Sequence, residues 1–214
     1  MFTYWAGGTG LGKSEERRQV QRAALIDAAE AAIVGRGLAG LRAREIAAAA
    51  GCALGAIYNL VADMDELTLL VGSRTLARLD IALAGAESSG PPDGTDAAAS
   101  RLVAIAIAYC RFARDNLNLW RALFEHRMTE GRPVPAWAIE EHMRLFAHVA
   151  PPLRALAPSL NATELALLSR TLFAAVHGVV LLGVEQKTVA VPQEALEQQI
   201  GQLVRLFCLG LRQS

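Results

Sequence analysis

The sequence is poor in several features, and each scarcity excludes a class of protein. Three cysteines among 214 residues, Cys52, Cys110 and Cys208, are odd in number and widely spaced, which excludes a disulfide scaffold and a cysteine-based zinc site. A buried structural role is usual for such cysteines, and a redox-sensing thiol is the alternative. His177 interrupts the longest apolar run, residues 173–184, before it reaches the ~18 residues that cross a bilayer. Because the start also lacks a secretory signal, we expect a cytoplasmic protein without a membrane segment.

Excess charge of either sign is also lacking, since 21 basic residues balance 21 acidic ones. Residues 1–62 contain seven Lys and Arg against five Asp and Glu, a net charge of +2 that leaves −2 for the remainder. Phosphate contacts depend on local clusters of basic side chains rather than on a basic whole. The charge distribution therefore permits DNA binding without requiring it, and 53% hydrophobic residues suffice for a sizeable core.

A short stretch near the start, GGTGLGKS at residues 7–14, matches the phosphate-loop pattern G-x-x-x-x-G-K-[ST]. In nucleotide enzymes this loop follows a buried strand and opens a helix, so that backbone N–H groups converge on phosphate. Only residues 1–6 precede the first glycine here, and no later segment predicts a partner strand or a magnesium-binding aspartate after a strand. We therefore predict a flexible leader over residues 1–14 and keep a P-loop nucleotide hydrolase as an alternative.

Almost every other segment favours helix, because apolar residues recur at spacings of three and four and strand-like alternation is absent. The expected helices span about 15–35, 42–50, 54–60, 63–84, 95–114, 116–128, 136–149, 162–186 and 192–212. Residues 87–96 form the clearest loop, and we expect Pro151 and Pro152 to break the chain after the seventh helix. The pattern predicts an all-α fold.

Three helix starts carry specific signals. Asp63 with Glu66, and Asn161 with Glu164, have the spacing of capping boxes. Pro192 is expected as the first residue of the last helix.

The two short helices at 42–50 and 54–60 are joined by a turn containing Gly51, which is the pattern of a helix-turn-helix whose second helix enters the major groove. Apolar spacing predicts that one set of side chains faces inward: Ile46, Ala47, Ala50, Ile57 and Val61. A second set is predicted to face outward: Leu54, Gly55, Ala56, Tyr58 and Asn59. Small residues at 55 and 56 would let this helix approach the groove closely.

From Arg22 to Leu67 the sequence RAALIDAAEAAIVGRGLAGLRAREIAAAAGCALGAIYNLVADMDEL resembles the DNA-binding domain of the tetracycline repressor (TetR) family. The family pattern of I-L-x-A-A, then R-x-I-A-x-x-A-G, a three-residue turn and G-x-x-Y is matched by residues 25–29, 44–51 and 55–58. The resemblance implies a helix-turn-helix DNA-binding domain at 15–62 and a helical ligand-binding and dimerisation domain at 63–214. It also implies a transcriptional regulator, usually a repressor, rather than an enzyme.

Four positions depart from the family pattern, and the recognition surface is unusually apolar. Ala53 stands where Ser or Thr usually caps the recognition helix, Leu54 replaces Lys or Arg, Val61 replaces Phe, and Arg42 occupies a Thr or Ser position.

We nevertheless expect Arg42, Arg44, Tyr58 and the arginines of the first helix to hold phosphates, although each arginine could equally be a solvated surface residue. Asn59 is the best candidate for a polar base contact, and Leu54 and Ala56 could touch thymine methyl groups.

The C-terminal segments NLWRALFEHRM and LFAAVHGVVLLG resemble a TetR subgroup with a Trp/His-Gly ligand-binding domain. The expected ligand pocket contains Tyr109, Phe112, Trp120, Phe124, Phe173 and His177, and Trp137 and Phe146 belong to the same aromatic set; simple core filling is the alternative at each position. The four histidines lack metal-ligand spacing and no catalytic constellation is identifiable, so we expect no metal, no cofactor and no catalysis.

The expected partners are a double-stranded, partly palindromic DNA operator, a small-molecule effector, and a second copy bound through helices 162–186 and 192–212. A helical small-molecule-binding protein without DNA function remains the alternative.

Overall fold

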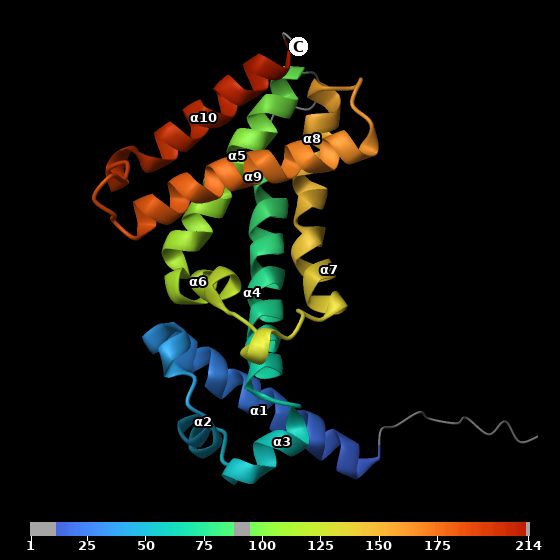
Figure 1. Ribbon diagram of the computed structural model, residues 1–214, viewed down its shortest axis with the longest axis vertical. Coiled ribbons are helices and arrows are strands. Elements are labelled where there is room, and N and C mark those ends of the chain that lie inside the picture. Colours follow the sequence, from blue (N-terminus) through green and yellow to red (C-terminus); the bar gives the residue numbers. More distant parts are fainter. Residues whose placement is uncertain (1–11, 88–94, 213–214) are drawn as a thin grey trace, which may run out of the picture. The chain divides into compact units, whose positions relative to one another are not determined.

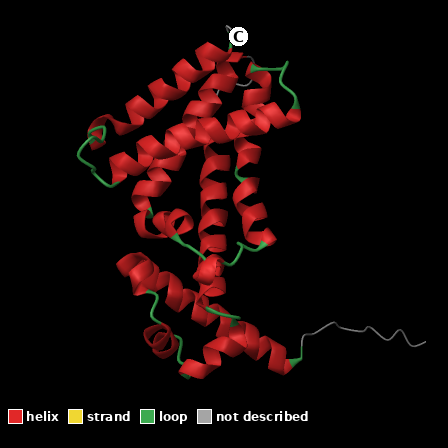
Figure 2. Ribbon diagram, viewed as in Figure 1, coloured by secondary structure: helices red, strands yellow, loops and turns green. Residues whose placement is uncertain are grey.

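The computed structural model describes residues 12–87 and 95–212, and every regular element in these two ranges is helical (Figures 1 and 2). The prediction of an all-α fold is confirmed. Residues 1–11 of the leader expected at 1–14 lie outside the described residues, and so do the first five residues of the phosphate-loop pattern and most of the loop at 87–96. Lys13 and Ser14, the last two residues of that pattern, form the start of the first helix.

The chain divides into two compact units, Met1–Val71 and Gly72–Ser214. Helix α4, Met64–Glu87, contributes its first residues to unit 1 and the remainder to unit 2.

Unit 1 is built on the apolar stripe of its long first helix. This first helix is α1, Lys13–Arg36. Before α4, unit 1 also contains the 3₁₀ turn η1 Gly37–Gly40, α2 Ala43–Ala49, the 3₁₀ turn η2 Leu54–Ala56 and α3 Ile57–Leu60. Leu25, Ala29 and Ile33 recur every four residues along α1 and are fully buried. Ile46 of α2 and Ile57 of α3 are buried as well, and both helices contact α1. Burying these apolar side chains on one helix fixes where the other two lie.

The turn after α2 follows the chemistry expected of a glycine stop. Gly51 has a φ of +69°, a left-handed conformation that glycine adopts without a steric penalty. Its N–H donates to the carbonyl of Ala48 (3.2 Å), and the N–H of Cys52 donates to that of Ala47 (2.9 Å), the pairing of a Schellman motif. The chain therefore leaves α2 in a defined direction before η2 begins.

Unit 2 surrounds helix α5. The elements that follow α4 are α5 Thr95–Asp115, α6 Leu117–Glu125, the 3₁₀ turn η3 Thr129–Gly131, α7 Ala136–Arg144, α8 Phe146–Leu156, α9 Ala162–Val184, the 3₁₀ turn η4 Gln193–Ala195 and α10 Leu196–Leu211. Helix α5 packs against α6, α8, α9 and α10, and α9 crosses α5 and α8 (Figure 1). The core of this unit includes Trp120, Leu153 and Ile200, all of them completely buried.

Two capping boxes were predicted, one at the start of α9 and one at the start of α4. The capping box at Asn161 and Glu164 is confirmed, because the Asn161 side chain accepts from the Glu164 N–H (3.0 Å) and the Glu164 side chain accepts from the Asn161 N–H (2.8 Å). Asp63 caps α4 by accepting from the Glu66 N–H (2.8 Å), while Glu66 also accepts from the N–H of Ala62.

Two proline predictions were wrong. The expected helix 136–149 is divided at Leu145 into α7 and α8, and α8 continues through Pro151 and Pro152. Each proline removes one backbone hydrogen bond, but Pro152 and its neighbour Leu153 are buried, so packing holds the helix together. Pro192 precedes η4 instead of opening α10.

Helix α9 is, by length and composition alone, apolar enough to cross a membrane. A core helix of a soluble protein passes the same test, and α9 packs against α5, α8 and α10. His177 therefore interrupts the apolar run without making the helix polar.

We predict that Gly40→Ala destabilises the protein. A Cβ at residue 40 would overlap the backbone carbonyl of Ala32, which cannot move without distorting α1. Overpacking of this kind costs about 1–3 kcal/mol, so the midpoint of urea unfolding should fall. Gly35→Ala is the matched control, because a Cβ there meets no atom within 4 Å and alanine favours helix. Equal midpoints for the two variants would contradict the argument.

Candidate functional site

The segment 54–60 presents one buried and one exposed side. Ile57 and Leu60 are buried in unit 1, whereas the Tyr58 side chain is 54% exposed and that of Leu54 is 41% exposed. Gly55 and Asn59 are exposed too, and Ala56 is half-buried. The residues assigned to an outward surface therefore lie together on a single short segment, with Ala56 at its edge.

Gly55 is a glycine that the protein itself does not require. A Cβ at this position would meet no atom within 4 Å, and its φ is not in the left-handed range. Neither packing nor backbone conformation within unit 1 explains the absence of a side chain. Close approach of something outside the chain would explain it.

The basic residues near this segment differ in whether a neighbouring carboxylate binds them. The Glu45 carboxylate binds both Arg36 and Arg42, the latter at 3.3 Å, and the hydrogen bond from Arg36 is the main reason why the pKa of Glu45 is lowered. The Arg44 side chain is exposed and forms no ion pair or hydrogen bond within the described ranges. Arg44 is thus available for an external anion, whereas Arg42 would have to share its charge with Glu45.

Two arginines of α1 have a structural role that the sequence analysis missed. Arg22 donates through Nε to the carbonyl of Leu60 (3.1 Å) and through Nη2 to Glu66 (3.1 Å). Arg18 donates through Nη2 to the carbonyl of Asn59 (3.3 Å). These contacts satisfy carbonyls that α3 leaves open at its C-terminal end. Since 38 residues separate Arg22 from Leu60, no local pattern in the sequence indicates the contact.

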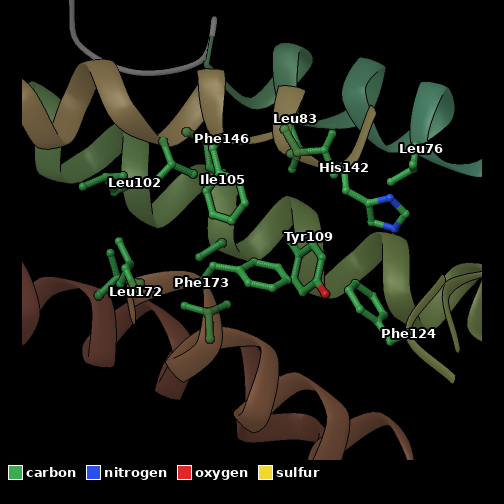
Figure 3. A pocket seen from close by; sticks show the side chains of 15 residues that line it. Leu76, Leu83, Leu102, Ile105, Tyr109, Phe124, His142, Phe146, Leu172 and Phe173 are labelled. Atoms are coloured by element: carbon green, nitrogen blue, oxygen red, sulfur yellow. The ribbon is translucent and has the colours of Figure 1, made fainter. Parts of the chain in front are cut away.

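Unit 2 contains an apolar cavity of about 160 Å³ (Figure 3). Helices α4 to α10 supply its walls: Leu76, Leu83, Leu102, Ile105, Ala106, Tyr109, Phe124, His142, Leu145, Phe146, Val149, Leu172, Phe173, Val176 and Val204. No Asp, Glu, Lys or Arg is among them. Figure 3 shows the Tyr109 hydroxyl and the His142 ring toward the Phe124 end, and Leu102 and Leu172 at the other end.

The aromatic residues expected at a ligand pocket are distributed unevenly around this cavity. Tyr109, Phe124 and Phe173 line it, together with Phe146. Trp120 and His177 lie behind the wall and contact Tyr109, Phe124 and Phe173 through ring edges and faces. Phe112 lines a separate surface groove between α4 and α5, and Trp137 is 37% exposed and lines none of these hollows. The sequence analysis missed His142 and the aliphatic wall, because aliphatic residues at helical spacing are indistinguishable from ordinary core.

A short hydrogen-bond chain holds the Tyr109 ring in place. The Trp120 indole N–H can only donate, and it donates to the Tyr109 hydroxyl oxygen (2.9 Å). The Tyr109 hydroxyl therefore donates its own hydrogen to Nδ1 of His177 (2.7 Å), which requires a neutral imidazole with its proton on Nε2. Burial lowers the pKa of His177 and raises the pKa of Tyr109, so both groups stay uncharged at neutral pH.

The two units together define a class of protein. Unit 1 is a helix-turn-helix with an exposed second helix, and unit 2 is a separate helical body with an internal cavity, the organisation of a DNA-binding regulator with a sensory domain. Among the described residues, no group of three or more His, Cys, Asp or Glu could hold a metal ion.

Comparison with known proteins identifies the family. Residues 102–205 match the model of the tetracyclin repressor-like C-terminal domain. This part of the chain is thus a TetR-type C-terminal domain, in agreement with the family resemblance predicted from the sequence, while the narrower Trp/His-Gly subgroup stays a prediction. The family indicates a transcriptional regulator rather than an enzyme, and TetR regulators bind DNA operators, often as dimers with small-molecule effectors.

Several solved structures share the fold. A proposed transcriptional regulator from Pseudomonas aeruginosa PAO1 is 22% identical, with a TM-score of 0.63 over 94% of this chain and 93% of the other. A TetR-like regulator from Rhodococcus sp. RHA1 is 19% identical, with a TM-score of 0.60 over 89% and 96%. RolR, solved in complex with the ligand resorcinol, is 17% identical, with a TM-score of 0.64 over 93% and 94%. No curated protein matches the sequence significantly.

We predict that Tyr109→Phe lowers stability while preserving the fold. The substitution keeps the ring but leaves the Trp120 N–H and His177 Nδ1 without their shared partner, and Trp120 is completely buried. An unsatisfied buried polar group costs about 1–3 kcal/mol, which urea unfolding would detect as a lower midpoint with an unchanged slope. Tyr58→Phe removes the same hydroxyl from an exposed ring and serves as the control. A Tyr109→Phe variant as stable as this control would show that the chain of hydrogen bonds contributes nothing.

Proposed function

We propose that this TetR-family regulator represses transcription by binding a partly palindromic DNA operator as a homodimer, and that a small molecule in the unit 2 cavity weakens this binding. The observation that carries the DNA-binding half is the exposed face of residues 54–60, which combines Tyr58 and Asn59 with a glycine that the fold does not need.

The residues on that face, together with the neighbouring Arg42 and Arg44, divide into two roles. Arg44, Tyr58 and Arg42 would hold backbone phosphates, with Arg44 the strongest candidate because its guanidinium has no partner in the described part of the chain. Asn59 can hydrogen-bond a base edge, and Leu54 and Ala56 can contact thymine methyl groups. The absence of a side chain at Gly55 would let the helix backbone lie close to the groove.

Helix α4 is the candidate for transmitting the effect of a ligand. Its first residues belong to unit 1, and Leu76 and Leu83 on the same helix line the cavity. A ligand that favours one arrangement of these two leucines would alter the whole helix, provided that it binds the two conformations with different affinity. The RolR complex supports this part only by indicating that a protein of similar fold holds a small molecule.

Exposed apolar side chains on α9 and α10 support a dimer. Only 28% of the most apolar 18-residue stretch of α9 is buried within one chain. Leu167 and Leu182 of α9 are exposed, as are Leu206 and Leu209 of α10. Covering such side chains with a second copy is favourable by about 25 cal/mol per Å² of apolar surface.

A ligand-binding protein without DNA function remains the second candidate, because the cavity alone would suit it. The DNA test below separates the two. The wild-type protein should select fragments from its own genome, and its affinity for them should fall steeply as salt rises, since phosphate contacts release counterions.

We predict that Gly55→Ala weakens operator binding without lowering stability. The added methyl meets nothing in the protein but would separate the helix from the groove, and overpacking of about 1–3 kcal/mol corresponds to roughly a fivefold to hundredfold increase in Kd. Fluorescence anisotropy on a selected fragment measures the affinity. Gly85→Ala on α4 is the matched control, because its Cβ is equally free of contacts. If the two variants bind equally well, residue 55 does not face DNA.

We also predict that the double variant Leu206→Arg with Leu209→Arg is monomeric. These side chains are 59% and 50% exposed on α10, so the arginines should be tolerated in one chain but introduce like charges into a symmetric interface. Sedimentation velocity at micromolar concentration should detect the change in mass. Ile81→Arg, at a 72% exposed position on α4, should leave the assembly intact. A double variant that sediments like the wild type would exclude this face as the interface.

A further inference from the structure

We infer that the unit 2 cavity selects a small, uncharged, monocyclic aromatic molecule that donates one hydrogen bond to Nε2 of His142. This inference rests on the proposed function in taking the cavity as the effector site, and it adds the chemical class of the effector and the residue that selects it.

The size of the cavity limits the ligand to about one ring. A dry apolar cavity of about 150 Å³ in another protein accepts benzene, and the cavity here is about 160 Å³. Phe146 and Phe173 supply aromatic edges and faces to its walls, and their rings lie 5.7 Å apart in an edge-to-face arrangement. Such walls favour a flat ring over a flexible chain of equal volume.

The walls also exclude charge. None of the 15 lining residues is Asp, Glu, Lys or Arg, so a carboxylate or ammonium group would enter without a counter-ion. Burying an unpaired charge is far more costly than burying a neutral polar group. The ligand that this cavity binds is therefore expected to be uncharged.

The hydrogen-bonding capacity of the cavity is mostly used within the protein. The Tyr109 hydroxyl already accepts from Trp120 and donates to His177. It therefore has no hydrogen to offer a ligand, and the carbonyl or ether oxygen of a ligand would find no donor there.

His142 is the polar group that remains. Its Nδ1 lies 2.8 Å from the carbonyl oxygen of Ala138, which can only accept, so the neutral ring carries its proton on Nδ1. Nε2 is then a pure acceptor, and within residues 12–87 and 95–212 it has no hydrogen-bond partner. The His142 ring lies at the Phe124 end of the cavity (Figure 3), and the 40% exposure of Phe124 marks this end as the one nearest solvent. A ligand hydroxyl or N–H would point to this end while its ring occupies the deep end near Ile105.

Calorimetry on the full-length protein with four probes tests the inference. Phenol donates a hydrogen bond, anisole keeps the oxygen but cannot donate, benzene has no polar atom, and benzoate is charged. At about pH 8, phenol should bind about fivefold to tenfold more tightly than anisole, the worth of one net hydrogen bond. Benzene should bind more weakly than phenol, and benzoate should give no measurable heat.

Variants of His142 assign the preference to its acceptor nitrogen. His142→Leu keeps the volume but removes the acceptor, so phenol and anisole should bind equally while benzene binding is retained. His142→Gln returns an acceptor near the position of Nε2 and should restore the preference for phenol. Retained benzene binding certifies that each variant has folded with its cavity intact. A preference for phenol that survives His142→Leu, benzoate binding as tight as phenol, or no binding of any probe would overturn the inference.

The result is separable from the proposed function. Release of operator DNA by some other compound, with no binding of these probes, would overturn the ligand class and leave the regulator intact. Failure to select any DNA would overturn the proposed function, and the four calorimetric affinities would still decide the chemistry of the cavity.

Discussion

The DNA-binding unit depends on the burial of Ile57 against the apolar stripe of α1. The recognition segment consists of one 3₁₀ turn and one α-helical turn, far too short to be stable as an isolated helix. Its conformation is therefore imposed by the core beneath it and by the hydrogen bonds that Arg22 and Arg18 make to its last carbonyls. Because Ile57 fixes the inner side of α3, Tyr58 and Asn59, the next two residues of the same turn, are held outward without contributing to the core. The exposed side chains could therefore be substituted without disturbing the core that holds the segment in place.

Unit 2 differs from unit 1 in holding an apolar cavity within its helical body. Tyr109 is central, because its ring forms part of the wall while its hydroxyl is fully occupied by Trp120 and His177. A polar chain satisfied within the protein leaves little for water to bind in the cavity, and the low pKa of His177 keeps charge away from it. Within the described residues, His142 forms a hydrogen bond through Nδ1 and none through Nε2. His177 is bound to Tyr109 behind the cavity wall, whereas His142 lines the cavity. The cavity therefore has a hydrogen-bond acceptor at one end and apolar side chains at the other.

The sequence analysis succeeded where the signal was local. The Asn161 capping box, the glycine turn after α2 and the 3.6-residue periodicity of α1 follow from residues within a few positions of one another, and the structure contains all three. It failed at Pro151 and Pro152, because burial of neighbouring side chains outweighs the loss of two backbone hydrogen bonds. It also treated the arginines of α1 as candidates for phosphate contact, whereas Arg22 is joined to Leu60 and Glu66, partners 38 and 44 residues away.

By itself, the sequence determined the all-helical fold, the position of the helix-turn-helix and the resemblance to the TetR family, since each depends on short-range spacing that any chain with these residues must express. Only the tertiary structure decided which aromatic residues line the cavity and which stand behind it. It also decided that Glu45 engages Arg36 and Arg42, whereas Arg44 has no partner among the described residues, and that His142 turns toward the cavity with Nδ1 bound to the Ala138 carbonyl. Those outcomes depend on which helices meet and at what angle. Packing between distant segments sets that geometry, and no local pattern of residues encodes it.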